Sequence, residues 1–259
     1  TMMEPTPVYI CTGFLDSGKT LLVKDTLMEQ EWIEPGLTLL ILCEEGEEEY
    51  SKEYLEENDM VLLKIDKFEQ LNAAFFTNCE KNYHPAQVVI EYNGMWKLDK
   101  IFDIRVPKGW TVVQVLSFVN AETYDVYQQN MKATMMDQVN SADMVVFNRC
   151  DENSKRAEWR RGIKAVNRRA QIIFEMKDGS IAPDVNDEED LPYDVKADVI
   201  ELNDEDFGIW YVDASDQPDR YVGKKIHFRG MVFKPKQYGK NAFVPGRFAM
   251  TCCVEDIQF

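Results

Sequence analysis

Long apolar runs, basic residues and paired cysteines are all scarce in this chain of 259 residues. No hydrophobic run approaches the roughly 18 residues that a membrane helix needs, so an integral membrane protein is not expected. The 29 Lys and Arg residues are outnumbered by 46 Asp and Glu residues, and the resulting charge of −17 opposes binding to nucleic acid. The N-terminal residues lack the basic region of a signal peptide, which predicts a cytoplasmic protein.

The six cysteines form neither a C-x-x-C pair nor a disulfide framework. Cys11, Cys43 and Cys150 lie at the ends of apolar runs, where reduced and buried thiols are expected. Cys252 and Cys253 are adjacent and can be read as a site for a soft metal ion. Neighbours on one strand point to opposite faces, however, so one buried and one exposed thiol is the alternative.

Residues 13–20 form the most informative motif in the chain. Their sequence, GFLDSGKT, fits the phosphate-loop pattern G-x-x-x-x-G-K-[ST]. The apolar run 8–12 before it predicts a strand, and the apolar spacing after it predicts a helix. In that context the backbone N–H groups of the loop cradle phosphate oxygens, so a chance match is the weaker interpretation. The predicted phosphate-binding residues are Gly13, Phe14, Leu15, Asp16, Ser17, Gly18, Lys19 and Thr20.

Four residues in and after this loop are expected to serve the γ-phosphate and its metal ion. Lys19 would reach the β- and γ-phosphates, and the Thr20 hydroxyl would ligate Mg²⁺. Glu91 ends the apolar strand 87–91 and suits a group that orients magnesium or its water shell. An exposed acid at a turn is the alternative for Glu91. Gly94 has no side chain, so its N–H can approach the γ-phosphate closely.

A second motif indicates which nucleotide binds. Asn148-Arg149-Cys150-Asp151 closes an apolar strand and is similar to the guanine-recognition signature N-K-x-D. There the Asp carboxylate accepts from guanine N1 and N2, the Asn supports the base and the loop, and the Lys stem lies along the ring. Adenine presents an acceptor at N1, so ATP is disfavoured. Arg149 replaces the Lys and can stack in its place. Ordinary polar residues at a strand end are the alternative.

Five acidic residues lie within the six positions 44–49. They can form a site for a hard cation, with Glu44 nearest to the preceding strand. They can also form the acidic first turn of the next helix, favoured by the helix dipole. The sequence leaves both interpretations open. The predicted metal ligands are Thr20, Glu44 and Glu91.

The order of apolar segments predicts an α/β fold with a doubly wound, mostly parallel sheet. Ligands bind such sheets at the carboxyl ends of the strands, where the phosphate loop lies. The predicted strands cover 8–12, 37–43, 61–65, 87–91, 111–116, 144–148 and 171–175, and the predicted helices cover 19–31, 47–57, 68–78, 130–142 and 155–167.

The composition changes after residue 176. We predict a P-loop domain over 1–178, an acidic linker over 179–206 and a small all-β module, similar to a partial barrel, over 207–259. The acidic run 184–190 dominates the linker. Strands are predicted at 209–212, 225–233 and 248–254.

With these motifs in this order, the chain resembles the CobW-type family of P-loop GTPases, relatives of the metallochaperones for nickel and cobalamin enzymes. That family carries G-F-L-G-[SA]-G-K-T-T, N-E-x-G-E, E-T-S-G and N-K-x-D. The resemblance covers roughly residues 7–176 and implies GTP or GDP and Mg²⁺ as ligands, with Zn²⁺ or another divalent metal as an ion to be handled. The matching residues are Gly13–Thr20, Glu44 with Gly46 and Glu47, Glu91 with Gly94, and Asn148 with Asp151.

The chain departs from the family pattern at several positions. Asp16 stands where glycine is usual, and Leu21 replaces the second Thr. The family's C-x-C-C metal motif is absent from its expected strand, 60–65, so a metal-transfer role does not follow from the resemblance. The tail around 247–253 resembles a small β domain of uncharacterised bacterial proteins whose genes accompany a predicted permease.

Four functions are compatible with these observations. The first is a GTPase, slow and partner-stimulated, with Lys19, Thr20 and Glu91 as its catalytic residues. The second is a metal-handling switch that serves a metalloprotein client. The third is a nucleotide-binding interaction module with negligible hydrolysis that docks a permease or another partner. The fourth is a small-molecule kinase, for which no acceptor pocket is apparent. A homodimer is one assembly that the sequence leaves open.

Overall fold

The computed structural model describes residues 5–28, 35–183, 191–234, 239 and 241–247. The chain divides into two compact units, residues 1–154 with 169–182 and residues 155–168 with 183–259. The predicted acidic run 184–190, the predicted strand 248–254 and Cys252-Cys253 lie outside the described residues. The predicted domain boundaries at 178 and 206 stay predictions.

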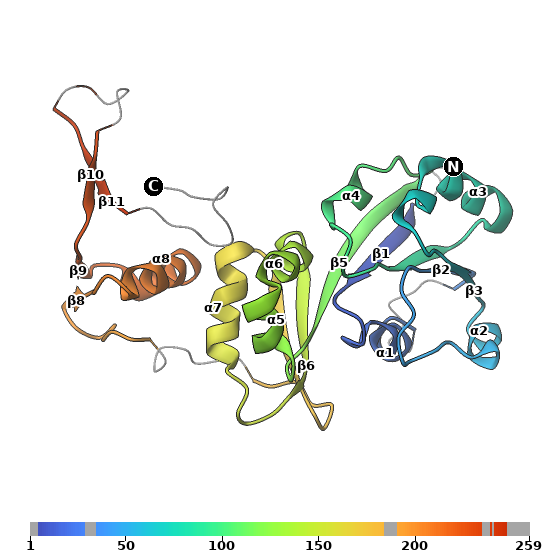
Figure 1. Ribbon diagram of the computed structural model, residues 1–259, viewed down its shortest axis with the longest axis horizontal. Coiled ribbons are helices and arrows are strands. Elements are labelled where there is room, and N and C mark those ends of the chain that lie inside the picture. The colour runs from blue at the N-terminus through green and yellow to red at the C-terminus, as the bar shows by residue number, and fades with distance from the viewer. Residues whose placement is uncertain (1–4, 29–34, 184–190, 235–238, 240, 248–259) are drawn as a thin grey trace. The chain divides into compact units, whose positions relative to one another are not determined.

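The first unit is built on a seven-stranded sheet in which all neighbouring strands are parallel (Figure 1). The strand order is β3-β2-β4-β1-β5-β6-β7, which places β1 in the middle of the sheet. Unbroken apolar runs suit such a sheet, and all five residues of β2 are buried. The predicted α/β fold is therefore confirmed. The strands are β1 (Thr6–Thr12), β2 (Thr38–Leu42), β3 (Met60–Lys64), β4 (Gln87–Glu91), β5 (Trp110–Asn120), β6 (Met144–Cys150) and β7 (Gln171–Met176).

The helices of the first unit are short and several are fixed by side-chain caps. Ser51 accepts a hydrogen bond from the Tyr54 N–H, and Asn72 accepts one from the Phe75 N–H, so these residues start two of the helices. Helix α1 continues directly as a π-helix. The bounds are α1 (Lys19–Leu22), η1 (Val23–Met28), α2 (Lys52–Glu57), η2 (Phe68–Gln70), α3 (Ala73–Tyr83), α4 (Asp99–Phe102), α5 (Tyr124–Asn130) and α6 (Lys132–Asn140).

The predicted helix over 47–57 is wrong in its first half, because α2 begins only at Lys52. The acidic residues 44–49 therefore do not form the first turn of a helix, and the helix-dipole interpretation of this run is excluded. We call residues 44–50 the acidic segment.

The register of the central strands sets the position of the site. Cys11 of β1 pairs with Glu91 of β4, and Thr12 pairs with Ser117 of β5. The loop that follows β1 therefore begins, at Gly13, beside the carboxyl ends of β4 and β5. Beneath it lies one buried apolar cluster, which consists of Cys11, Val23, Leu40, Met60, Val89, Leu116, Phe118 and Val146.

In its described residues, the second unit contains two small sheets and two longer helices. Strands β8 and β9 are parallel, and β10 and β11 are antiparallel. Its own apolar core contains Leu191, Tyr193, Val195, Ile200 and Leu202. The elements are α7 (Arg156–Val166), β8 (Val199–Glu201), α8 (Asp206–Asp216), η4 (Pro218–Tyr221), β9 (Lys225–His227), β10 (Met231–Phe233) and β11 (Val244–Gly246).

The predicted strand at 209–212 is wrong, because these residues lie inside helix α8. The Asn203 side chain accepts hydrogen bonds from the N–H groups of Glu205 and Asp206, which favours a helical first turn. Phe207 and Trp210, three residues apart, share one helix face with ring centroids 5.3 Å apart. The predicted strand 225–233 is two strands, separated by residues 228–230.

Candidate functional site

The loop between β1 and α1 depends on two glycines with positive φ. Gly13 has φ 141° and Gly18 has φ 102°, which favour glycine at both positions. A Cβ at Gly13 would meet the Phe118 carbonyl oxygen, and one at Gly18 would meet the Asn148 amide nitrogen. The loop is also closed by a hydrogen bond from the Ser17 N–H to the Phe14 carbonyl, 3.0 Å long. The phosphate-loop sequence thus folds as a tight turn that leads into a helix.

Lys19 is held inside this turn. Its Nζ donates to the carbonyl oxygens of Gly13 (2.7 Å) and Phe14 (3.0 Å) and to the carboxylate of Glu44 (2.8 Å). The side chain is only 6% exposed. The ammonium group is therefore fixed among the loop carbonyls, the position from which a lysine of this motif can reach bound phosphates.

Thr20 and Glu91 meet next to the loop. The Thr20 hydroxyl donates to Glu91 Oε2 at 2.9 Å, and the Tyr50 hydroxyl donates to Glu91 Oε1. Glu91 is 1% exposed, and burial raises its pKa, while the hydrogen bonds from Tyr50 and Thr20 lower it. Burial raises the pKa of Tyr50 well above its usual value, so this phenol remains a donor. A hydroxyl and a carboxylate are the hard oxygen ligands that Mg²⁺ prefers, and a cation here would offset the desolvated charge of Glu91.

Gly94 brings the chain after β4 against the phosphate loop. A Cβ at this position would collide with the Gly13 carbonyl oxygen. The Gln138 side chain donates to the Gly94 carbonyl at 2.9 Å and holds this backbone in place. The structure therefore places Gly94 against the phosphate loop, while the approach of its N–H to the γ-phosphate stays a prediction.

The Asn148-Arg149 pair is bound to the phosphate loop although it lies more than 130 residues later in the chain. Asn148 Nδ2 donates to the Ser17 carbonyl at 2.6 Å, and an Arg149 guanidinium nitrogen donates to the Asp16 carbonyl at 3.1 Å. Arg149 has φ 56°, which turns the chain at the end of β6. The Asn148 Oδ1 atom is buried and has no hydrogen-bond partner. The structure therefore brings the two predicted binding motifs together.

Asp151 presents an ionised carboxylate at the same end of the sheet. It accepts from Lys177 Nζ at 3.0 Å and from the Asn153 N–H at 2.9 Å. The hydrogen bond from Lys177 lowers the pKa of Asp151. Its side chain is 40% exposed, which leaves it accessible to a ligand. An exposed acceptor carboxylate is what the two donors of guanine require.

The acidic segment is bound both to the phosphate loop and to the helix that follows it. In its middle, the Glu47 N–H donates to Asp16 Oδ1 at 2.8 Å, so the Asp16 carboxylate is directed toward this segment. Near its end, Lys24 of η1 donates to the Glu49 carbonyl at 2.5 Å. Tyr50 follows and contacts Glu91. The sequence motifs include Asp16 but neither Lys24 nor Tyr50. The only sequence signal for Tyr50 was an aromatic residue directly after an acidic run.

The predicted metal ligands have different partners. Glu44 pairs with Lys19, whereas Glu91 accepts from Thr20 and Tyr50. Within the described residues, no group of three or more His, Cys, Asp or Glu side chains is arranged to hold a metal ion. Cys11, Cys43, Cys79 and Cys150 are reduced and buried, and burial raises the pKa of Cys43 to about 12. Cys11, Cys43 and Cys150 are thus the buried thiols that the sequence predicts.

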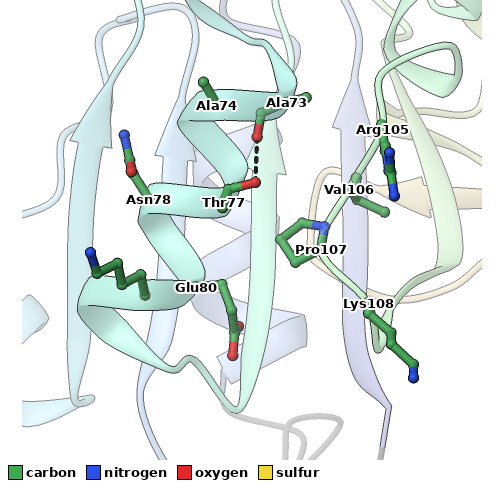
Figure 2. Close-up of a pocket in the computed structure, with 10 residues that line it drawn as sticks. Ala73, Ala74, Thr77, Asn78, Glu80, Arg105, Val106, Pro107 and Lys108 are labelled. Carbon is green, nitrogen blue, oxygen red and sulfur yellow. Dashed lines mark hydrogen bonds between the residues drawn. The ribbon is translucent and has the colours of Figure 1, made fainter.

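Two of the hollows on the described part of the first unit bear on the search for a ligand site. A small one of ≈130 Å³ beside the phosphate loop, lined in part by Phe14 and Tyr127, has room for about four waters. A larger, open one of ≈730 Å³ lies between α3 and residues 105–108 (Figure 2). Residues 105–108 precede β5, so this hollow is near the amino ends of the strands and away from the loop. It is not the nucleotide site.

Comparison with known proteins agrees with this geometry. A family model described as "CobW/HypB/UreG, nucleotide-binding domain" matches residues 7–174. The chain belongs to the CobW/HypB/UreG family. A second model, "DUF1980 C-terminal domain", matches residues 182–259. No curated protein matches the chain. Within its described part, every helix is too short or too polar to cross a lipid bilayer.

One solved structure shows the same fold for the nucleotide-binding part of this CobW/HypB/UreG family member, and two others are also similar to the chain. A Zn(II)-bound triple mutant of the YjiA GTPase is 22% identical, with a TM-score of 0.51, over 70% of this chain and 60% of YjiA. Zn(II)-bound YjiA from E. coli is 22% identical, with a TM-score of 0.49, over 66% of this chain and 57% of its own. The hydrogenase maturation factor HypB of Archaeoglobus fulgidus is 19% identical, with a TM-score of 0.47, over 68% and 84%. The chain thus spans about three fifths of YjiA.

Proposed function

We propose that this protein binds guanine nucleotide with Mg²⁺ and hydrolyses GTP slowly, as a regulatory or metal-trafficking GTPase. The observation that carries the proposal is the convergence of Lys19, Thr20 and Glu91 on one loop to which Asn148 is also hydrogen-bonded. Membership of the CobW/HypB/UreG family and the fold shared with the YjiA GTPase support it.

The chain's own residues have separate tasks in this proposal. The loop amides and Lys19 bind the phosphates, and Thr20 and Glu91 would hold Mg²⁺, which supplies positive charge to the phosphate oxygens. A water oxygen forms a bond to the γ-phosphorus while the bond to the bridging β–γ oxygen breaks, which yields GDP and phosphate. Gly94 would place its N–H near the γ-phosphate. We assign no arginine to the γ-phosphate, so turnover is slow unless a partner stimulates it.

Guanine selectivity is assigned to Asp151, with Asn148 and Arg149 as its support. The Asp151 carboxylate would accept from guanine N1 and N2. Adenine would leave those lone pairs opposite an acceptor, which costs binding free energy. Because Arg149 donates to the Asp16 carbonyl, base recognition and the phosphate loop would change together.

A nucleotide-binding interaction module with negligible hydrolysis is the second candidate. A specific observation favours it, because the second unit exposes Met231, Val232, Phe233 and Phe243 on and beside β10, and exposed apolar groups of this kind mark docking surfaces. A permease or a metalloprotein client is the partner proposed. A phosphate-release assay separates the two candidates, since only the GTPase forms phosphate at a measurable rate.

Replacement of the loop lysine tests the proposal. Lys19→Ala should abolish GTP binding, because the ammonium that faces the phosphates is removed, and titration calorimetry should detect no heat of binding. Lys52→Ala is the matched control, since the Lys52 side chain is 83% exposed on α2 and should leave affinity unchanged. Undiminished affinity in Lys19→Ala would rule out this site.

A further inference from the structure

Tyr50 contacts the acid that we assign to magnesium. Its hydroxyl donates to Glu91 Oε1, while Thr20 donates to Oε2 of the same carboxylate. The two donors come from different parts of the chain, Thr20 from α1 and Tyr50 from the end of the acidic segment. A carboxylate bound through one oxygen can rotate about its last bond, whereas one bound through both oxygens cannot. Tyr50 and Thr20 together therefore fix the orientation of Glu91.

The position of Tyr50 is itself fixed by contacts that the nucleotide motifs do not include. Its ring is partly buried and packs against the apolar cluster beneath the loop. Lys24 Nζ lies 5.4 Å from the centre of the Tyr50 ring and 5.7 Å from that of Tyr54. The two tyrosine rings are 6.0 Å apart. Lys24 also donates to the Glu49 carbonyl, next to Tyr50.

These contacts have one consequence for a bound ion. Groups that hydrogen-bond a metal-binding carboxylate orient it and set its affinity for the ion, and removing them typically lowers that affinity 10–100-fold. We propose that Tyr50 is a positioning residue for Glu91, and that through Tyr50 the acidic segment sets how tightly the nucleotide site holds Mg²⁺. This inference rests on the proposed function, because it takes Glu91 as the acid of the magnesium site.

The test measures magnesium dependence and not turnover. Release of a fluorescent GDP from the full chain is followed while free Mg²⁺ is varied, and the concentration that slows release by half is recorded. Tyr50→Phe should raise this concentration about tenfold or more, because Glu91 loses one of its two donors. The affinity for GDP in EDTA should be unchanged, because Tyr50 is assigned no contact with the nucleotide.

Tyr54→Phe is the matched control. It removes a hydroxyl from the neighbouring ring and leaves both hydrogen bonds to Glu91 in place, so its magnesium dependence should equal that of the wild type. An unchanged magnesium dependence in Tyr50→Phe, or an equal rise in both variants, would overturn the proposal. Failure of the wild type to bind GDP at all would instead contradict the proposed function.

If Tyr50→Phe does not fold, a second variant tests the same proposal. Lys24→Met keeps most of the unbranched side chain and removes the charge beside Tyr50 and the donor to Glu49. The looser acidic segment should raise the half-effective Mg²⁺ concentration about threefold. Melting temperatures of all three variants confirm that folded proteins are compared. No change in Lys24→Met would then overturn the proposal.

Discussion

At the scale of single residues, the side chains of Lys19 and Asp16 show that the phosphate loop is hydrogen-bonded to other groups of the protein. Lys19 donates to Glu44, an acceptor that a phosphate would have to replace. Asp16 has φ 58°, a conformation that favours glycine but that Asp tolerates, and its carboxylate accepts from the Glu47 N–H. The departure from glycine at this position is therefore explained by a contact with the acidic segment.

Neutralising Glu44 should strengthen nucleotide binding. In Glu44→Gln the ammonium of Lys19 loses a charged competitor, so GDP affinity in EDTA should rise roughly tenfold. Titration calorimetry without Mg²⁺ measures this effect separately from any role of Glu44 at the metal. Glu45→Gln is the control, because the Glu45 carboxylate pairs with Lys64 at 2.7 Å instead. Equal or weaker GDP binding in Glu44→Gln would show that the ion pair does not oppose the nucleotide.

At the scale of elements, the strand order and the register determine where the site lies. Strands β4 and β5 flank β1, so the residues after β4 reach the phosphate loop, and β6 carries Asn148 to it. Gly94 marks the closest approach, since no side chain fits between it and Gly13. This arrangement makes the loop sensitive to any change in the backbone after β4.

Adding one methyl group at Gly94 tests that sensitivity. Gly94→Ala should reduce the free energy of unfolding by about 1–3 kcal/mol, because the Cβ collides with the Gly13 carbonyl, and it should weaken GDP binding. Urea unfolding and calorimetry give the two values. Gly208→Ala is the control: it lies in α8, a Cβ there meets nothing within 4 Å, and a gain of up to about 1 kcal/mol is expected. Similar effects in both variants would contradict this account.

The elements also show what the sequence can predict. All seven strands of the sheet were predictable, because parallel strands covered on both faces are unbroken apolar runs. Residues 209–212 were predicted as a strand because aromatic and β-branched residues favour strands in isolation. The Asn203 cap and the Phe207–Trp210 contact instead stabilise a helix there. Tyr50 could not be assigned, since its bond to Glu91 joins residues 41 positions apart outside any motif.

At the scale of the whole molecule, two different family models, 7–174 and 182–259, correspond largely to the two compact units. The exception is residues 155–168, which lie in the second unit but within the first family model. Every residue that we assign to the nucleotide lies between 13 and 151, in the first unit. The assigned metal ligands and guanine contacts leave the second unit for a different task, for which its exposed apolar residues around β10 are candidates.

Hydrogen exchange should reflect this division. On addition of GTP and Mg²⁺, exchange should slow in residues 13–20, in the acidic segment and in residues 91–94, because these segments contact the ligand or each other. Peptides from 199–227 should be unchanged and serve as the internal control. Protection confined to the second unit would contradict the assignment of the site.

The most direct test of the central claim is competition between GTP and ATP for the wild-type chain, measured by calorimetry with Mg²⁺, with and without Zn²⁺. We predict that GTP binds with one site per chain and that ATP binds at least about a hundredfold more weakly, because adenine presents an acceptor to the Asp151 carboxylate where guanine presents two donors. Zn²⁺ should change GTP affinity only if the chain handles metal. Equal affinity for the two nucleotides, or no binding of either, would contradict the account.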